Sequence, residues 1–140
     1  MKSNYPLIKI LFVLNYIIFI SSYLYTILIN PGIPSKEYYI PNFRHKKIVE
    51  EEWTKCLKCN ILIPNNFNVT HCVDCDVCVI DMDHHCPWTG KCIGKYNKKS
   101  FLIFVNSLCI YFIMAFITFY SYMFYNSYLD RKKEKINSIF

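Results

Sequence analysis

Apolar residues gather in two long runs along the chain, and a more polar stretch separates them. The first run covers residues 7–29, where Lys9, Asn15 and the pair Ser21–Ser22 interrupt it. The second run covers residues 101–123 and is similarly apolar. A helix over either run would be about 34 Å long, enough to cross the roughly 30 Å core of a bilayer. The pattern therefore predicts two transmembrane helices with the polar stretch between them.

The boundaries of the two runs divide the rest of the chain. The first helix is expected to end at Asn30-Pro31-Gly32, because proline disfavours helical geometry in the residue before it. Residues 30–52 are then a juxtamembrane linker, residues 53–100 a cysteine-rich domain and residues 124–140 a polar tail. The first run has neither the short core nor the small-residue cleavage site of a signal peptide, so we expect it to remain as a helix.

Seven of the eight cysteines lie between residues 56 and 92, together with three of the four histidines. The pairs Cys56-x-x-Cys59 and Cys72-x-x-Cys75 have the spacing with which two thiolates hold one tetrahedral zinc ion. A disulfide framework would need an oxidising compartment and does not explain the interleaved histidines. The stretch is too short to bury a core of its own, so bound metal would have to supply its folding energy. We therefore expect a small domain of short hairpins and loops between the two helices.

Two zinc ions need eight ligands, whereas this stretch offers ten thiol and imidazole groups, so two groups are left for chemistry. Neighbouring side chains on an extended segment point to opposite faces. If His85 binds metal, His84 and Cys86 face a common pocket, where an imidazole takes the proton of a nucleophilic thiol. Asp83 would orient that imidazole, provided that a turn or bulge brings it to the same face.

Three ordered motifs carry a family resemblance: His71-Cys72-x-x-Cys75-x-x-Cys78, then Asp83-His84-His85-Cys86-Pro87-Trp88, and then Cys92-Ile93-Gly94-x-x-Asn97-x-x-x-Phe101. They resemble the DHHC family of protein S-acyltransferases. The resemblance implies a multi-pass membrane enzyme that moves a long acyl chain, usually palmitoyl, from acyl-CoA onto its own cysteine as a thioester. A cysteine of a protein substrate then receives the chain.

The resemblance also implies a role for each site residue. Cys86 would be the nucleophile, His84 its base and Asp83 the group that orients the base. Two structural zinc ions would be bound in an interleaved manner. By this resemblance one ion takes Cys56, Cys59, His71 and Cys78, and the other takes Cys72, Cys75, His85 and Cys92.

The chain departs from the family pattern at several places. Asn30 stands where an aspartate is usual, and Lys91 stands where asparagine is usual. The family generally has four spans and a Thr-Thr-x-Glu motif after the fourth, whereas this sequence predicts two spans and contains no Thr-Thr pair. It is therefore a partial sequence, an inactive short relative, or an enzyme completed by self-association or an accessory subunit. The alternative function is a truncated, non-catalytic, membrane-anchored zinc module that binds proteins.

Four lysines precede the second run, and they have two interpretations that can hold at once. They form the positive cytosolic flank of a membrane span, or some of them contact the phosphates of CoA, for which Lys95, Lys98 and Lys99 are the candidates. The four residues are Lys91, Lys95, Lys98 and Lys99. Three further side chains have a structural interpretation that the sequence favours and an alternative. Trp88 packs in a core or lies at the membrane interface, and Cys109 is a small buried group in the second span or an acylated thiol. Asn15 is a tolerated polar residue or a contact between helices.

Reduced thiols place the zinc domain in the cytosol. We therefore expect a multi-pass protein of an endomembrane (Golgi or endoplasmic reticulum) or of the plasma membrane. Its expected partners are acyl-CoA, membrane lipid and protein substrates with membrane-proximal cysteines. The flanking spans and the nearly balanced charge of the polar stretch argue against a nucleic-acid partner.

Overall fold

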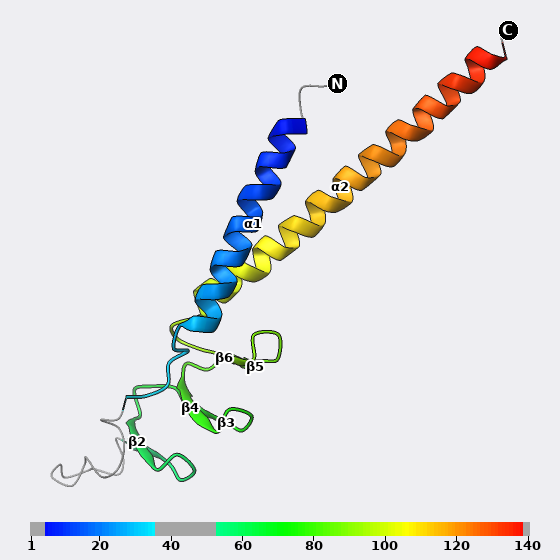
Figure 1. Ribbon diagram of the computed structural model, residues 1–140. Coiled ribbons are helices and arrows are strands. Elements are labelled where there is room, and N and C mark those ends of the chain that lie inside the picture. Colours follow the sequence, from blue (N-terminus) through cyan, green and yellow to red (C-terminus); the bar gives the residue numbers. More distant parts are fainter. Residues whose placement is uncertain (1–4, 36–52, 139–140) are drawn as a thin grey trace. The chain divides into compact units, whose positions relative to one another are not determined.

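The computed structural model describes residues 5–35 and 53–138 (Figure 1). These residues fall into two compact units, one made of residues 1–19 and 105–140 and the other of residues 20–104. Residues 36–52, which hold most of the expected juxtamembrane linker, lie outside the described part. Each unit is considered by itself.

Two long helices and three hairpins make up the described part of the chain. Helix α1 spans Tyr5–Leu28, and helix α2 spans Lys98–Asn137. Both are long and apolar enough to cross a membrane. The predicted fold class, two apolar helices flanking a small hairpin-rich cysteine and histidine domain, is confirmed. Helix α2 is not confined to the apolar run, because it continues through most of the residues for which a polar tail is expected.

In the unit formed by residues 1–19 and 105–140, a polar side chain joins the two helices. The Asn15 side-chain amide donates a hydrogen bond to the carbonyl oxygen of Ser107 over 3.0 Å, and Asn15 is buried. Beside this bond the rings of Phe12 and Tyr111 meet edge to face. Asn15 is therefore a helix contact, the less favoured of its two interpretations from the sequence.

The other unit contains three antiparallel hairpins. Strand β1 (Trp53–Cys56) pairs with β2 (Ile61–Pro64), β3 (Val69–Cys72) with β4 (Val77–Ile80), and β5 (His84–Cys86) with β6 (Lys91–Ile93). A left-handed residue precedes each second strand: Asn60, Asp76 and Gly90 have φ values of 54°, 53° and 64°. Asn, Asp and Gly are the residues that adopt this conformation most readily, which explains why each turn closes there.

The apolar core of the hairpin domain is small and consists largely of cysteine. One cluster joins Ile61 and Ile63 to Cys78, and a second joins Val79 to Cys72 and Cys92. Isolated two-stranded hairpins are marginally stable in water. The domain therefore depends on interactions between its thiols as much as on apolar packing.

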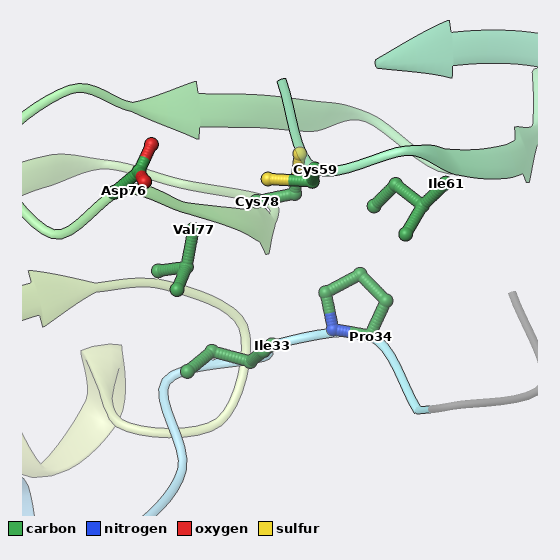
Figure 2. A pocket seen from close by; sticks show the side chains of 7 residues that line it. All are labelled: Ile33, Pro34, Cys59, Ile61, Asp76, Val77 and Cys78. Atoms are coloured by element: carbon green, nitrogen blue, oxygen red, sulfur yellow. The ribbon is translucent and has the colours of Figure 1, made fainter. Parts of the chain in front are cut away.

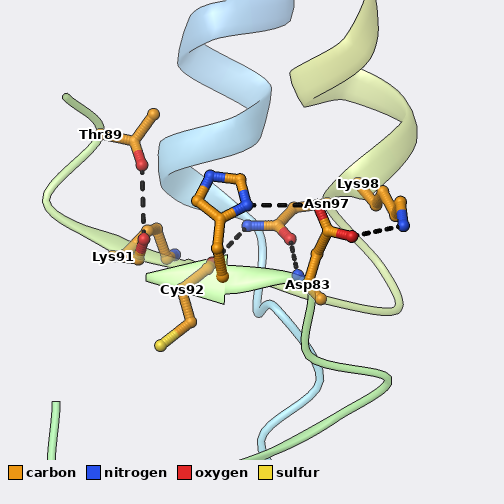
Figure 3. Close-up of polar contacts among 8 residues, drawn as sticks. Asp83, Thr89, Lys91, Cys92, Asn97 and Lys98 are labelled. Carbon is orange, nitrogen blue, oxygen red and sulfur yellow. Dashed lines mark hydrogen bonds and ion pairs between the residues drawn. The ribbon is translucent and has the colours of Figure 1, made fainter. Parts of the chain in front are cut away.

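A buried asparagine fastens the domain to the helices at the start of α2. The side chain of Asn97 accepts a hydrogen bond from the Gly94 amide and donates to the carbonyl oxygen of Cys92 (Figure 3). It also donates to the carbonyl oxygen of Thr26. Nearby, the hydroxyl of Thr26 donates to that of Ser100 over 2.8 Å. Gly94 is required at this junction, because an added Cβ would lie 2.6 Å from the carbonyl oxygen of Pro31.

We expect Asn97→Ala to lower the free energy of unfolding by about 3 kcal/mol, since it removes three hydrogen bonds worth about 0.5–1.5 kcal/mol each. Thermal unfolding in detergent measures the change. Asn66→Ala is the matched control, because Asn66 is exposed in a turn and its loss should cost less than about 0.5 kcal/mol. Equal melting temperatures for the two variants would contradict the role given to Asn97.

Candidate metal centres and nucleophile site

The first and second hairpins bring together one group of four candidate ligands. Their ligand atoms all lie within 4.8 Å of one another. The Nδ1 atom of His71 is 3.8, 3.2 and 3.9 Å from the sulfur atoms of Cys56, Cys59 and Cys78. This group, named centre 1 here, has the donor set of a Cys₃His zinc site.

The second and third hairpins bring together the other group, named centre 2. The Nδ1 atom of His85 is 3.7, 3.2 and 3.9 Å from the sulfur atoms of Cys72, Cys75 and Cys92. The sulfur atoms of Cys75 and Cys92 are 3.5 Å apart. The geometry of centre 2 thus repeats that of centre 1.

The middle hairpin supplies ligands to both centres. His71 and Cys72 are neighbours on β3, so their side chains leave opposite faces of the strand. His71 accordingly belongs to centre 1, and Cys72 belongs to centre 2. The interleaved grouping that the family resemblance implies is the grouping that the structure brings together.

Both clusters fit a tetrahedral zinc ion. An ion bonded at about 2.3 Å to sulfur and about 2.0–2.1 Å to nitrogen would separate each sulfur from the nitrogen by about 3.6 Å. The observed separations lie on both sides of this value. Burial and the neighbouring thiols raise the pKa of Cys78 and of Cys92. Because zinc ligands are thiolates, these groups need a cation among them, and the two clusters are consistent with two zinc sites.

Centre 1 has a carboxylate close to its histidine. The Nε2 atom of His71 is buried, and its nearest charged neighbour is Asp76 Oδ1 at 3.5 Å. Such an outer carboxylate commonly orients a metal-binding imidazole. Figure 2 shows Asp76 at the edge of a pocket of about 200 Å³ that also reaches Cys59 and Cys78. Centre 1 therefore borders an open hollow on this side.

A cysteine outside both centres sits at the end of β5. Cys86 is only 3% exposed and pairs across the hairpin with Lys91. Burial raises the pKa of the Cys86 thiol, but hydrogen bonding by the Thr89 side chain and the His84 imidazole outweighs it, so the pKa is lowered. The Thr89 hydroxyl also lies within hydrogen-bonding distance of the carbonyl oxygen of Cys86 and of that of Lys91, the second of which Figure 3 shows. The environment of Cys86 thus favours a thiolate.

His84 connects this thiol to a carboxylate. Its Nδ1 atom is 3.2 Å from Asp83 Oδ2, and its ring meets that of Phe101 edge to face at 5.2 Å. Burial lowers the pKa of His84, but the interactions with Cys86 and Asp83 raise it by more. Asp81, with a φ of 48°, turns the chain shortly before Asp83, and the carboxylate reaches the imidazole as the sequence analysis requires.

The ion pair between Lys98 and Asp83 was not predicted by the sequence analysis. The lysine ammonium donates to Asp83 Oδ1 over 2.6 Å from the first turn of α2 (Figure 3). The Lys98 ammonium and then His84 lower the pKa of the Asp83 carboxyl group. The lysine was considered only as part of a positive flank or a CoA contact, and its position three residues before Phe101 gave no signal of the ion pair.

Four other side chains from the sequence analysis lie outside this group of contacts. The Lys95 ammonium is over the ring of Phe67, 5.2 Å from its centre, so this lysine makes a cation–π contact. Lys99 is exposed. The expectation that Trp88 packs in a core is wrong, because it lies in the β5–β6 turn with 87% of its surface exposed. Cys109 is likewise exposed on α2 rather than buried.

Comparison with known proteins gives consistent results. The sequence model of one family, described as DHHC palmitoyltransferase, matches residues 49–140. Palmitoyltransferase akr1 of Schizosaccharomyces pombe is 34% identical over 146 aligned positions, covering 96% of this chain and 22% of that protein. Palmitoyltransferase ZDHHC20 of Homo sapiens is 30% identical over 158 positions, covering 92% and 42%. The chain therefore spans less than half the length of these two relatives.

We expect His85→Ala to lower the zinc content from two ions per chain to one or fewer, because it removes a ligand from centre 2. The adjacent variant His84→Ala is the matched control and should keep both ions, since His84 belongs to neither centre. Metal analysis of the purified chain measures both values. An unchanged zinc content in His85→Ala would reject His85 as a ligand.

Proposed function

Because this chain belongs to the DHHC palmitoyltransferase family, we propose that it acts as a protein S-acyltransferase in which Cys86 carries the acyl chain as a thioester. The proposal rests on the successive contacts of the Cys86 thiol, the His84 imidazole and the Asp83 carboxylate. The thiol lies outside both metal centres, its pKa is lowered, and its neighbouring imidazole contacts a carboxylate. These are the features of an activated cysteine.

The reaction would proceed in two steps. In the first, His84 takes the proton of the Cys86 thiol, and the sulfur attacks the carbonyl carbon of acyl-CoA. The new carbon–sulfur bond forms as the bond to CoA breaks, and the CoA thiolate receives the proton from His84. In the second step, the thiol of a target protein attacks the acyl-Cys86 thioester, and Cys86 leaves as a thiol.

Asp83 and Phe101 would hold the base in place. The contact of Asp83 Oδ2 with the Nδ1 atom of His84 leaves the Nε2 atom of the ring to exchange a proton with sulfur. The Lys98 ammonium fixes the other oxygen of the same carboxylate, and the ring of Phe101 limits rotation of the imidazole. The base is thus oriented by groups from two elements, the residue before β5 and the first turns of α2.

The two metal ions would have a structural task. Zinc bound by four protein ligands has no open position for substrate. His85, a ligand of centre 2, lies between His84 and Cys86 in β5, so its bond to the metal would fix the strand that presents the base and the nucleophile. Loss of metal would therefore reduce activity by displacing these two groups.

The lysines before α2 differ in how well they suit CoA. Lys95 rests on Phe67 and Lys98 holds Asp83, so each would have to leave a partner to reach a phosphate. Lys99 is exposed and adjacent to them, and we assign it the main contact with the anionic phosphates. The acyl chain would lie along the apolar helices, where burial contributes about 0.8 kcal/mol per methylene.

The proposal also covers the membrane side on which the protein acts and the kind of cysteine that it acylates. The zinc domain would face the cytosol, where thiols stay reduced, with α1 and α2 in an endomembrane or in the plasma membrane. Cys86 lies in the hairpin next to the ends of both helices, so target cysteines near the membrane surface would reach it.

We expect Cys86→Ser to abolish labelling of the chain by a radioactive long-chain acyl-CoA in membranes. The wild-type label should be released by hydroxylamine, which cleaves thioesters. Cys109→Ser is the matched control, because Cys109 lies in α2 and should not accept the chain first. An unlabelled wild type with both zinc ions bound would instead favour the non-catalytic membrane-anchored zinc module.

We expect His84→Ala to slow acylation of Cys86 by about 10²–10⁴-fold, the usual contribution of a positioned general base. Single-turnover labelling measures the rate, and metal analysis of the same sample confirms that both centres are filled. A rate within a factor of three of wild type would show that another group takes the thiol proton.

A further inference from the structure

Lys91 makes two direct hydrogen bonds from the Cys86 hairpin to the end of α1. It lies on β6 directly opposite Cys86. Its ammonium donates to the carbonyl oxygens of Ile27 and Ile29 over 2.9 and 2.7 Å. One side chain thus connects the cross-strand partner of the nucleophile to the carboxyl end of a candidate membrane span.

A cation is well suited to this position. The last four carbonyl groups of a helix have no partner within the helix, and the helix dipole places partial negative charge there. Asn97 donates to the carbonyl of Thr26, and Lys91 satisfies those of Ile27 and Ile29. The last turn of α1 is therefore capped by side chains of the zinc domain.

Other links also join the end of α1 to the domain. The Ile80 amide donates to the carbonyl of Gly32 over 2.9 Å, and the Asn97 side chain donates to the carbonyls of Thr26 and of Cys92 on β6. Asn97 thus holds the middle of β6, whereas Lys91 holds the end of β6 that lies opposite Cys86. The contribution of Lys91 is therefore the position of the part of the β5–β6 hairpin that contains the Cys86 thiol.

We propose that Lys91 is a positioning residue for Cys86, and that its bonds to the end of α1 fix how deeply the thiol lies relative to the membrane. The catalytic consequence rests on the proposed function, because it concerns delivery of an acyl carbonyl to Cys86. Asparagine, the usual residue at this place in the family that the sequence resembles, is too short to reach as far as a lysine. The chain thus uses a longer, charged link here.

The test measures depth without requiring acyl transfer. The full chain is placed in phosphatidylcholine nanodiscs, and alkylation of Cys86 is followed by peptide mass spectrometry with two reagents. One is a sulfonated, water-soluble maleimide, and the other is a maleimide attached to a lipid headgroup. We expect Lys91→Met to change the ratio of the two rates at least fivefold with both zinc ions bound.

Two variants serve as controls. Lys91→Arg keeps a cation and several donors, so its ratio should stay within twofold of wild type. Lys55→Met removes an exposed lysine from β1 and should have no effect on the ratio. A ratio for Lys91→Met within twofold of wild type would overturn the proposal.

If Lys91→Met fails to bind zinc, the same alkylation ratio is measured on Lys91→Asn instead. Asparagine is polar and is the usual residue at this place in the family that the sequence resembles. The same fivefold change is expected, and a wild-type ratio, or loss of zinc in this variant too, would overturn the proposal.

Acylation with chains of several lengths is measured on the same samples, where Lys91→Met should be about tenfold slower. If Lys91→Met changes the ratio of the two alkylation rates but the wild-type chain is not acylated, Lys91 remains a positioning residue and the proposed function is rejected.

Discussion

The two clusters of three cysteines and one histidine are the feature on which the hairpin domain depends, and the attraction between their thiolates and a cation would hold each cluster together. Three two-stranded hairpins with a few buried isoleucine and valine side chains cannot hold one another by apolar burial alone. Their cysteines occupy the places that larger apolar side chains fill in other domains. A cation at each cluster removes the repulsion between thiolates and ties hairpins that share no backbone ladder.

The same ligands explain why the reactive groups are available. A strand that gives one residue to a metal turns the residues on either side away from it. His85 faces centre 2, and this leaves His84 and Cys86 together on the other face, beside the aromatic start of α2. Centre 2 and the candidate nucleophile Cys86 thus lie on the two faces of one short strand, and the position of one fixes the position of the other.

The sequence predicted those parts of the structure that repeat or follow a pattern. Apolar length predicted both helices, and cysteine spacing predicted a domain with two metal centres. The contacts of Lys98 with Asp83 and of Lys91 with Ile29 join single residues that are distant in sequence, and no periodicity marks them. Trp88 was misjudged because an aromatic residue next to buried cysteines suggests a core, whereas the turn geometry carries it outward.

The middle hairpin bears on how zinc ions would enter the two centres. Strands β3 and β4 contribute to both centres, so the first ion to bind would order a segment that the second ion also needs. The entropy of ordering that segment would be lost once, and the second ion would meet ligands already in place. Loading of the two centres would then be positively cooperative, and a shortage of zinc would change the number of folded molecules rather than their average occupancy.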